Sequence, residues 1–237
     1  MPSRPRIIHV ARGKFGYLLF ALLVLLTTAP LVTEGFFWTI VIALFATALL
    51  VAGLYAANPR RSSLILGLSL AAVDFGIGRL ASHLGGGWLL GVQAILWLIT
   101  LTYVTIVILE YVLASQPVTL ETLQAAFCVF LLMGLVWTYF YIVVEIVNPG
   151  SFLSAESKPV SWSSDATGRN SFLRFLIMSY ATISARDYDG LGPASDFASI
   201  CNCLESMTAQ VYLAVIVARL VGLQISESEH RREADAT

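Results

Sequence analysis

Six long runs of mainly apolar residues constrain the fold of this chain of 237 residues more than any other feature of its sequence. A membrane-spanning helix needs about 20 apolar residues, because the hydrocarbon core is about 30 Å thick and a helix rises about 1.5 Å per residue. We therefore predict an all-α integral membrane protein with six transmembrane helices. The six runs are Phe15–Val32, Phe36–Ala57, Ser63–Ser82, Gly87–Leu113, Leu123–Val147 and Phe197–Leu223.

The composition argues against the main classes of soluble protein. Hydrophobic residues make up 57% of the chain and charged residues 12%, whereas soluble domains have about 45–50% apolar and about 25% charged residues. A formal net charge of −1 provides no overall field to attract nucleic acid, so no nucleic-acid partner is expected. The six runs also leave almost no length for a separate domain, and a water-soluble enzyme is not expected either.

The basic residues predict the orientation in the membrane. If the N-terminus is cytoplasmic, nine basic residues lie on or near that side and five on the other, and cytoplasmic loops are enriched in Lys and Arg. We therefore expect a multi-pass protein of the cell membrane with both termini cytoplasmic, residues 1–14 forming an N-terminal segment and 225–237 a tail. The first run has 18 apolar residues and no A-x-A site after it, so we expect a retained helix, not a cleaved signal peptide.

One connection differs from the other, short ones. Residues 148–196 separate the fifth run from the sixth, and within them Ser171–Ile183 reads SFLRFLIMSYATI, an apolar run too short to cross a bilayer. A short run between two spans is typical of a re-entrant helix, which is tolerated where its backbone is buried in protein or lines a water-filled cavity. The order of span, re-entrant helix and span predicts a pore module.

Three stretches in this region resemble parts of a known family. They are NPGSF at 148–152, FLRFLIMSYATISARDYDGLGP at 172–193 and QVYLAVIVARLVGL at 210–223. In their order and spacing, they resemble the pore domain of the bacterial potassium-channel family, over residues 121–224. The resemblance implies a homotetramer whose subunits each have a peripheral four-helix region and a pore domain with three parts. Those regions are 15–113 for the peripheral helices and 119–224 for the pore domain, with outer helix 123–147, pore helix and filter 171–189, and inner helix 197–223.

The filter positions depart from the family sequence. Where the family has Thr-Val-Gly-Tyr-Gly-Asp, this chain has Thr182, Ile183, Ser184, Ala185, Arg186 and Asp187. A potassium filter presents successive backbone carbonyls to the ion, which requires positive φ angles that cost a non-glycine residue about 1–2 kcal/mol each. We therefore expect Ser184 and Arg186 to disfavour the carbonyl ladder, and the protein not to select strongly for potassium.

Arg186 raises a second, electrostatic objection to potassium selectivity. Four guanidinium groups about 5 Å from a cation would repel it by roughly 13 kcal/mol at an effective dielectric constant of 20. If Arg186 faces the axis, cations are excluded, and anions pass or the pore is closed. If it pairs with Asp187 or Asp189, a wider and poorly selective opening results. The sequence leaves both orientations, and hence the permeant ion, open.

Two carboxylates inside predicted spans flank the short helix. Glu145 lies near the end of the fifth run and Glu205 in the outer half of the sixth, and ionisable residues at such depth are functional candidates. We expect them, together with Asp189, to support the filter, chiefly by hydrogen bonding, with proton-sensitive sites as the alternative. Cys201 and Cys203 have no accompanying His, so neither a metal site nor a cofactor is expected.

These features predict an ion channel of potassium-channel-like architecture that moves ions across the cell membrane, with membrane lipid and copies of itself as partners. The alternative is a nonconducting protein that keeps the channel fold for a structural or interaction role. An intramembrane hydrolase is not expected, because the partial G-x-S pattern at Gly67–Ser69 has no histidine at membrane depth to act as base. Repeated halves typical of secondary transporters are not recognisable.

Overall fold

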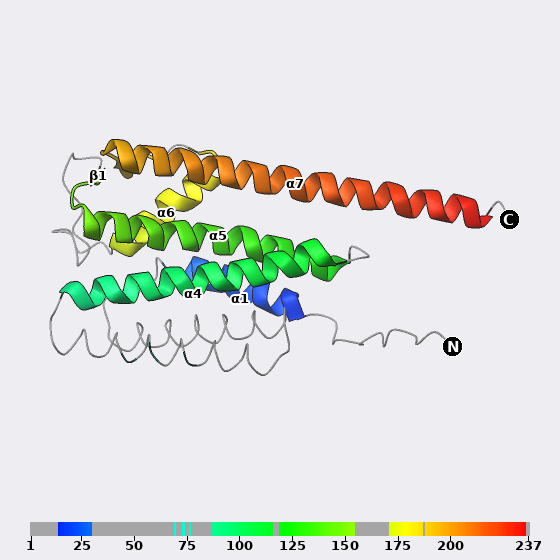
Figure 1. Ribbon diagram of the computed structural model, residues 1–237, viewed down its shortest axis with the longest axis horizontal. Coiled ribbons are helices and arrows are strands. Elements are labelled where there is room, and N and C mark those ends of the chain that lie inside the picture. The colour runs from blue at the N-terminus through cyan, green and yellow to red at the C-terminus, as the bar shows by residue number, and fades with distance from the viewer. Residues whose placement is uncertain are drawn as a thin grey trace.

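The structure is a computed structural model that describes residues 14–29, 87–115, 119–154, 171–186 and 188–235, and the single positions Ser69, Val73 and Gly76. Most of these residues are helical, and a small two-stranded antiparallel sheet lies at one end of the helices (Figure 1). The helices are α1 (Lys14–Thr28), α4 (Gly87–Ala114), α5 (Leu120–Val147), α6 (Ser171–Ile183) and α7 (Asp196–Asp235), and the strands are β1 (Phe152–Ser154) and β2 (Leu191–Pro193).

Within the described part of the chain, three helices are long and apolar enough to cross a membrane. They contain the segments Gly91–Ala114, Leu120–Val147 and Asp196–Arg219, with mean hydropathies of 2.2, 2.3 and 1.5. The expectation of a helical membrane protein is confirmed at this level. Helices α1 and α6 are also apolar but have only 15 and 13 residues. Two predicted spans, 36–57 and 63–82, lie outside the described residues apart from Ser69, Val73 and Gly76, as do residues 1–13 of the predicted N-terminal segment.

The start of α5 and the end of α7 lie beyond the predicted boundaries because polar residues continue these helices. Helix α5 begins at Leu120, three residues before the apolar run, because Thr119 and Thr122 form a capping box. The hydroxyl of Thr119 accepts the backbone N–H of Thr122 at 3.3 Å, and the hydroxyl of Thr122 accepts that of Thr119 at 3.4 Å. Helix α7 continues to Asp235, well into the predicted tail, because Glu, Ala and Arg in that stretch favour helix.

Helix α5 is the central helix, and α1, α4, α6 and α7 all contact it. Its apolar segment is 56% buried, compared with 22% for the segments in α4 and α7. Side chains of α1 and α4, including Phe15, Leu22 and Ile108, form one core with the first half of α5. The aromatic residues Tyr141, Phe152 and Phe175 form the centre of a second core at the other end of α5. The outer faces of α4 and α7 are left uncovered by the described part of the chain.

Helix α6 lies between α5 and α7 (Figure 1), where a glycine of α5 lets it approach closely. A Cβ atom added to Gly134 would lie 2.7 Å from two ring carbons of Tyr180, which is closer than any real contact allows. The Tyr180 hydroxyl donates to the Leu131 carbonyl at 2.5 Å, and the Ser179 hydroxyl lies 2.8 Å from the Gly134 carbonyl. The second half of α6 therefore rests directly on the backbone of α5.

The strands return the chain to the end of α5 from which it departed. Strand β1 follows α5 and pairs with β2, which follows α6, with Phe152 opposite Pro193 and Ser154 opposite Leu191. The last turn of α6, by contrast, packs near Gly134, which precedes the end of α5 at Val147 by about 20 Å at about 1.5 Å per residue. The chain thus runs from one end of α5 to its middle and back to the same end.

One arginine joins the other half of α7 to α4. The Arg219 guanidinium donates to the carbonyl of Val112 and, at 2.6 Å, to that of Ser115, both at the C-terminal end of α4. Carbonyls at a helix C-terminus lack partners within the helix and carry partial negative charge, so a cation there is favourable. Arg219 thereby fixes α7 to the peripheral helices at the point where its apolar segment ends.

Replacing Gly134 by alanine should destabilise the protein. The new methyl group would push Tyr180 away from α5, and such overpacking typically costs about 1–3 kcal/mol. Gly222→Ala in α7 is the matched control, because nothing lies within 4 Å of its added Cβ and alanine favours helix. We expect thermal unfolding in detergent micelles to show a lower Tm for Gly134→Ala and an unchanged or higher Tm for Gly222→Ala. Equal changes in the two variants would contradict the close approach of α6.

Candidate functional site

The fully buried carboxylate of Glu205 connects three helices. It lies on α7 with 0% of its surface exposed, and it accepts hydrogen bonds from the Tyr141 hydroxyl of α5 and, at 2.5 Å, from the Ser179 hydroxyl of α6. A buried carboxyl group is tolerated only where such partners compensate for its lost hydration. Glu205, predicted from the sequence as a candidate, therefore fixes how α5, α6 and α7 lie against one another.

A second polar contact lies one turn earlier on α7. The side-chain amide of Asn202 donates to the Thr182 hydroxyl at 2.9 Å, and that hydroxyl donates to the Met178 carbonyl at 3.0 Å. Thr182 is the first of the predicted filter residues, so the end of α6 is bonded directly to α7. The sequence analysis did not single out Tyr141, Ser179 or Asn202. The available signal was a carboxylate in an apolar span, because such a group requires polar partners on neighbouring helices.

Thr182 and Ile183, the first two of the predicted filter residues, form the last turn of α6. The helix then ends in a Schellman motif, in which the N–H of Arg186 donates to the Ala181 carbonyl at 2.8 Å and that of Ala185 to the Thr182 carbonyl at 3.0 Å. The Ser184 hydroxyl donates to the Tyr180 carbonyl at 2.5 Å. These bonds engage the carbonyls within the helix end, and Thr182–Arg186 forms no carbonyl ladder.

Ser184 and Arg186, which stand where the family has glycine, do not have positive φ angles. Ala185, with φ of 53°, is the one non-glycine residue with a positive φ in the described part of the chain. A Schellman motif needs a single left-handed residue just after the helix, which costs a non-glycine residue about 1–2 kcal/mol, and Ala185 is that residue here. Asp187, the last predicted filter residue, lies outside the described residues.

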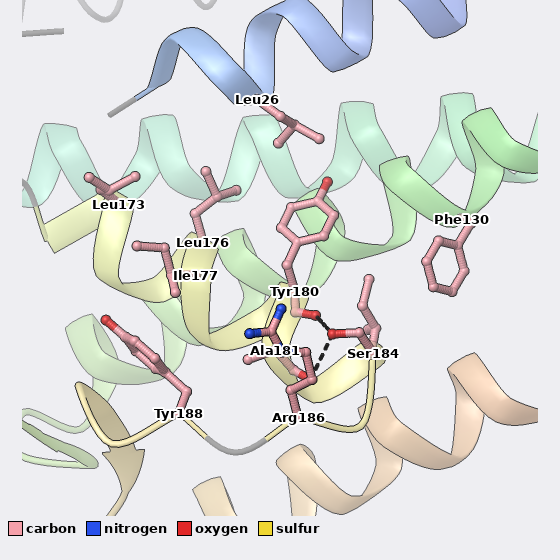
Figure 2. A pocket seen from close by; sticks show the side chains of 11 residues that line it. Leu26, Phe130, Leu173, Leu176, Ile177, Tyr180, Ala181, Ser184, Arg186 and Tyr188 are labelled. Carbon is pink, nitrogen blue, oxygen red and sulfur yellow. Dashed lines mark hydrogen bonds between the residues drawn. The ribbon is translucent and has the colours of Figure 1, made fainter. Parts of the chain in front are cut away.

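The side chain of Arg186 turns back toward α6 and lines a hollow beside that helix (Figure 2). It makes no ion pair with any residue that the structure describes, and Asp189, one of its two expected partners, is described. Its place beside the C-terminal end of a helix is electrostatically favourable.

The hollow has a volume of about 480 Å³ and mostly apolar walls. One face of α6 forms its floor, and α1 and α5 contribute one side chain each (Figure 2). The Tyr188 ring, which follows the end of α6, packs against Gly190 and lines it as well. The described lining residues are Leu26, Phe130, Leu173, Leu176, Ile177, Tyr180, Ala181, Ile183, Ser184, Arg186 and Tyr188.

Glu145 supports the turn after α5, not the end of α6. Its two carboxylate oxygens accept the backbone N–H of Gly150 at 2.7 Å and that of Phe152 at 3.0 Å, and its side chain is 4% exposed. Gly150 has a φ of +90°, which glycine adopts without strain. Because Phe152 begins β1 and pairs with Pro193 of β2, Glu145 stabilises the strand pair through which the chain returns.

Helix α7 carries a polar face along its apolar segment, which the sequence analysis missed. The residues recur every three or four positions, so they lie on one side of the helix, and each is exposed or half-buried. The Gln210 amide donates to the Ser206 hydroxyl at 3.4 Å. Polar side chains in a span are costly toward lipid, so such a face indicates contact with water or protein. The four residues are Ser199, Asn202, Ser206 and Gln210.

No cluster of three or more His, Cys, Asp or Glu able to hold a metal occurs among the described residues. The three cysteines are free, Cys128 and Cys201 buried and Cys203 exposed. No family model, curated protein or solved structure matches this chain. The resemblance to the potassium-channel family remains a prediction from the motifs within residues 121–224.

Removing one donor to Glu205 should destabilise the protein measurably. Tyr141→Phe and Ser179→Ala each leave a buried carboxylate oxygen without a partner, with an expected loss of about 1–3 kcal/mol. Because both donors serve one carboxylate, the double variant should deviate from additivity by about 0.5 kcal/mol or more. Tyr17→Phe is the control, since this tyrosine is 80% exposed. Unfolding in detergent measures all four variants, and a Tyr141→Phe variant as stable as Tyr17→Phe would contradict the bond.

Replacing Glu145 by glutamine should loosen the turn after α5. The amide keeps one acceptor oxygen but points an NH₂ group at the other backbone N–H, so one bond to Gly150 or Phe152 is lost. Loss of a bond to a charged group, about 1.5–3 kcal/mol, should speed amide hydrogen exchange there by about tenfold or more. Exchange in peptides covering 148–154 tests this, and Glu121→Gln at the other end of α5 should leave them unchanged. Equal exchange in both variants would exclude the capping role.

Proposed function

We propose that this chain is one subunit of a homotetrameric ion channel of potassium-channel-like architecture, with α5, α6 and α7 forming one quarter of a central pore. In this proposal the chain crosses the membrane six times, both termini are cytoplasmic, and α6 is a re-entrant helix that enters from the outer side. The observation that carries it is that α6 ends beside the middle of α5, against the polar face of α7.

The position of the end of α6 supports a water-filled path. If α5 spans the bilayer, its middle at Gly134 lies near the centre, and the turn after α6 lies at a similar depth. Ser184, Ala185 and Arg186 in that turn are exposed in the single chain. Irregular backbone at such depth is tolerated only where protein buries it or water reaches it. Further copies surrounding an aqueous pore satisfy that requirement.

The polar face of α7 extends this path along the membrane. Asn202 bonds to Thr182 at the end of α6, and Ser206 and Gln210 continue the same face toward the other end of the span. A single chain cannot enclose such a surface, whereas a ring of identical copies can. The number four rests on the resemblance to the potassium-channel family.

The end of α6 also supports weak selectivity between potassium and sodium. Potassium filters replace the hydration shell with free carbonyl oxygens, and here the carbonyls of Tyr180, Ala181 and Thr182 accept hydrogen bonds within the helix end. The polar face of α7 is uncharged, so it favours neither sign of ion strongly. The same closed helix end favours the second candidate, a nonconducting protein that uses the channel fold for assembly or interaction.

Ion flux through the purified protein in liposomes tests the proposal. We expect flux with little difference between potassium and sodium, and a reduced flux in Gln210→Leu, which removes a polar group from the predicted pore surface. Thr208→Val is the matched control, because Thr208 lies on another face of α7 and bonds to its own helix at Leu204. Both variants should keep the wild-type Tm.

Three results would contradict parts of the proposal. A folded protein that is monomeric or dimeric in several mild detergents and in lipid would exclude the tetramer. A folded tetramer without flux would favour the nonconducting alternative. Strong potassium selectivity in the unmutated protein would mean that Thr182–Arg186 rearranges into a carbonyl ladder.

A further inference from the structure

We propose that Glu205 is a proton-binding site: in this arrangement of the helices it is a neutral carboxylic acid, and its proton completes the hydrogen bonds that join α5, α6 and α7. The inference rests on the contacts of the buried carboxyl group. Ion conduction and the number of subunits do not enter into it, and the proton is measurable on a protein that passes no ions.

A row of three oxygen–oxygen contacts runs through Glu205. One carboxyl oxygen contacts the Tyr141 hydroxyl, and the other lies 2.5 Å from the Ser179 hydroxyl. The Ser179 hydroxyl also lies 2.8 Å from the Gly134 carbonyl oxygen. Such distances are those of O–H···O hydrogen bonds, so each contact requires a proton of its own. The Thr138 hydroxyl donates to the same carbonyl at 2.7 Å, but its proton serves that separate contact.

The hydroxyl groups of the row supply only two of the three protons. Tyr141 and Ser179 have one hydroxyl proton each, whereas a carbonyl and an ionised carboxylate have none. If Glu205 is ionised, Ser179 donates to it and no proton remains between Ser179 and Gly134. If Glu205 is protonated, the bond to Ser179 runs in the other direction and Ser179 donates to Gly134. Only the protonated form turns all three contacts into hydrogen bonds.

The surroundings of Glu205 also favour the neutral form. Its side chain is 0% exposed, and the ionisable groups that face it are Tyr141 from α5 and Tyr180 from α6, with Cys201 of α7 beside Tyr141. No Lys, Arg or His among the residues that the structure describes faces the carboxyl group. An ionised carboxylate away from water is costly unless a cation pairs with it, and such a group takes up a proton instead.

Release of the proton should loosen α6. Hydroxide removes the carboxyl proton, which leaves water and a carboxylate of charge −1. The Ser179 proton then turns to Glu205, and the contact of Ser179 with Gly134 changes from a hydrogen bond to a repulsion between two oxygens. Because this contact joins α6 to α5, alkaline pH should weaken their association. If the chain conducts, the proton thereby regulates the path beside the end of α6, and this last step alone rests on the proposed function.

Glutamine variants of the two buried glutamates test the proton count by thermal unfolding in detergent at neutral pH. Glu205→Gln keeps an acceptor for Tyr141 and adds an N–H donor toward Ser179, as a carboxylic acid does, so Tm should stay within about 2 °C of the wild type. Glu145 is the matched control, because it accepts two backbone N–H groups and has no donor to replace. Glu145→Gln should lower Tm by about 3–10 °C.

Infrared spectroscopy of the protein in lipid detects the proton directly. Ordinary carboxyl groups are ionised above about pH 6, so a C=O stretching band of a protonated carboxyl group at neutral pH identifies an unusual one. We expect this band in the wild type and in Glu145→Gln, and its loss in Glu205→Gln. In the wild type it should also disappear as the pH is raised. Over that pH range, amide exchange in 171–186, corrected for its intrinsic pH dependence, should speed by about tenfold in the wild type and stay unchanged in Glu205→Gln.

Three results would overturn the proposal. The first is a folded wild-type protein without the band of a protonated carboxyl group at neutral pH. The second is a Tm of Glu205→Gln that falls as far as that of Glu145→Gln, since an ionised Glu205 would lose a charged acceptor in the same way. The third is exchange that speeds equally in the wild type and in Glu205→Gln. Because none of them involves flux, a protein that passes no ions would contradict the proposed channel and leave the proton site standing.

Discussion

The bonds of one buried carboxylate hold the centre of this structure together. Glu205 accepts hydrogen bonds from the hydroxyls of Tyr141 on α5 and Ser179 on α6, and Asn202, one turn away, donates to the Thr182 hydroxyl of α6. Helices in a membrane have little hydrophobic drive to associate, so polar contacts and close packing determine their arrangement. Gly134 provides the close packing, because its missing side chain makes room for Tyr180.

The opposite end of the α6 segment is held by different chemistry. Glu145 accepts two backbone N–H groups in the turn after α5, and the pairing of β1 with β2 ties the outgoing and returning chain together. Side-chain hydrogen bonds therefore hold the C-terminal end of α6. The two ends of the segment that contains α6 are held by the Glu145 carboxylate and by the backbone pairing of β1 with β2. The polar face of α7 and the exposed turn after α6 meet at the C-terminal end of α6, and we therefore propose a path through the membrane there.

Much of the fold follows from the sequence, because run length and hydropathy are local properties. The helix Ser171–Ile183 has the predicted bounds, and Glu205 and Glu145 are buried and bonded. The geometry of Thr182–Arg186 could not be taken from the family sequence, because local hydrogen bonds that close the end of α6 determine it here. Tyr141 and Ser179 could not be assigned, since they lie 64 and 26 positions from Glu205 and only packing brings them together. The polar face of α7 was detectable from its spacing alone.

Helix α7 is unbroken over 40 residues, about 60 Å at about 1.5 Å per residue, which is twice the thickness of the hydrocarbon core. An unbroken helix transmits torque, so twisting its far end would turn Glu205 and Asn202 about the same axis. Their hydrogen-bond partners belong to α5 and α6, so such a rotation would strain those bonds. Arg219, bonded to the end of α4, would resist the same rotation at the other half of the helix.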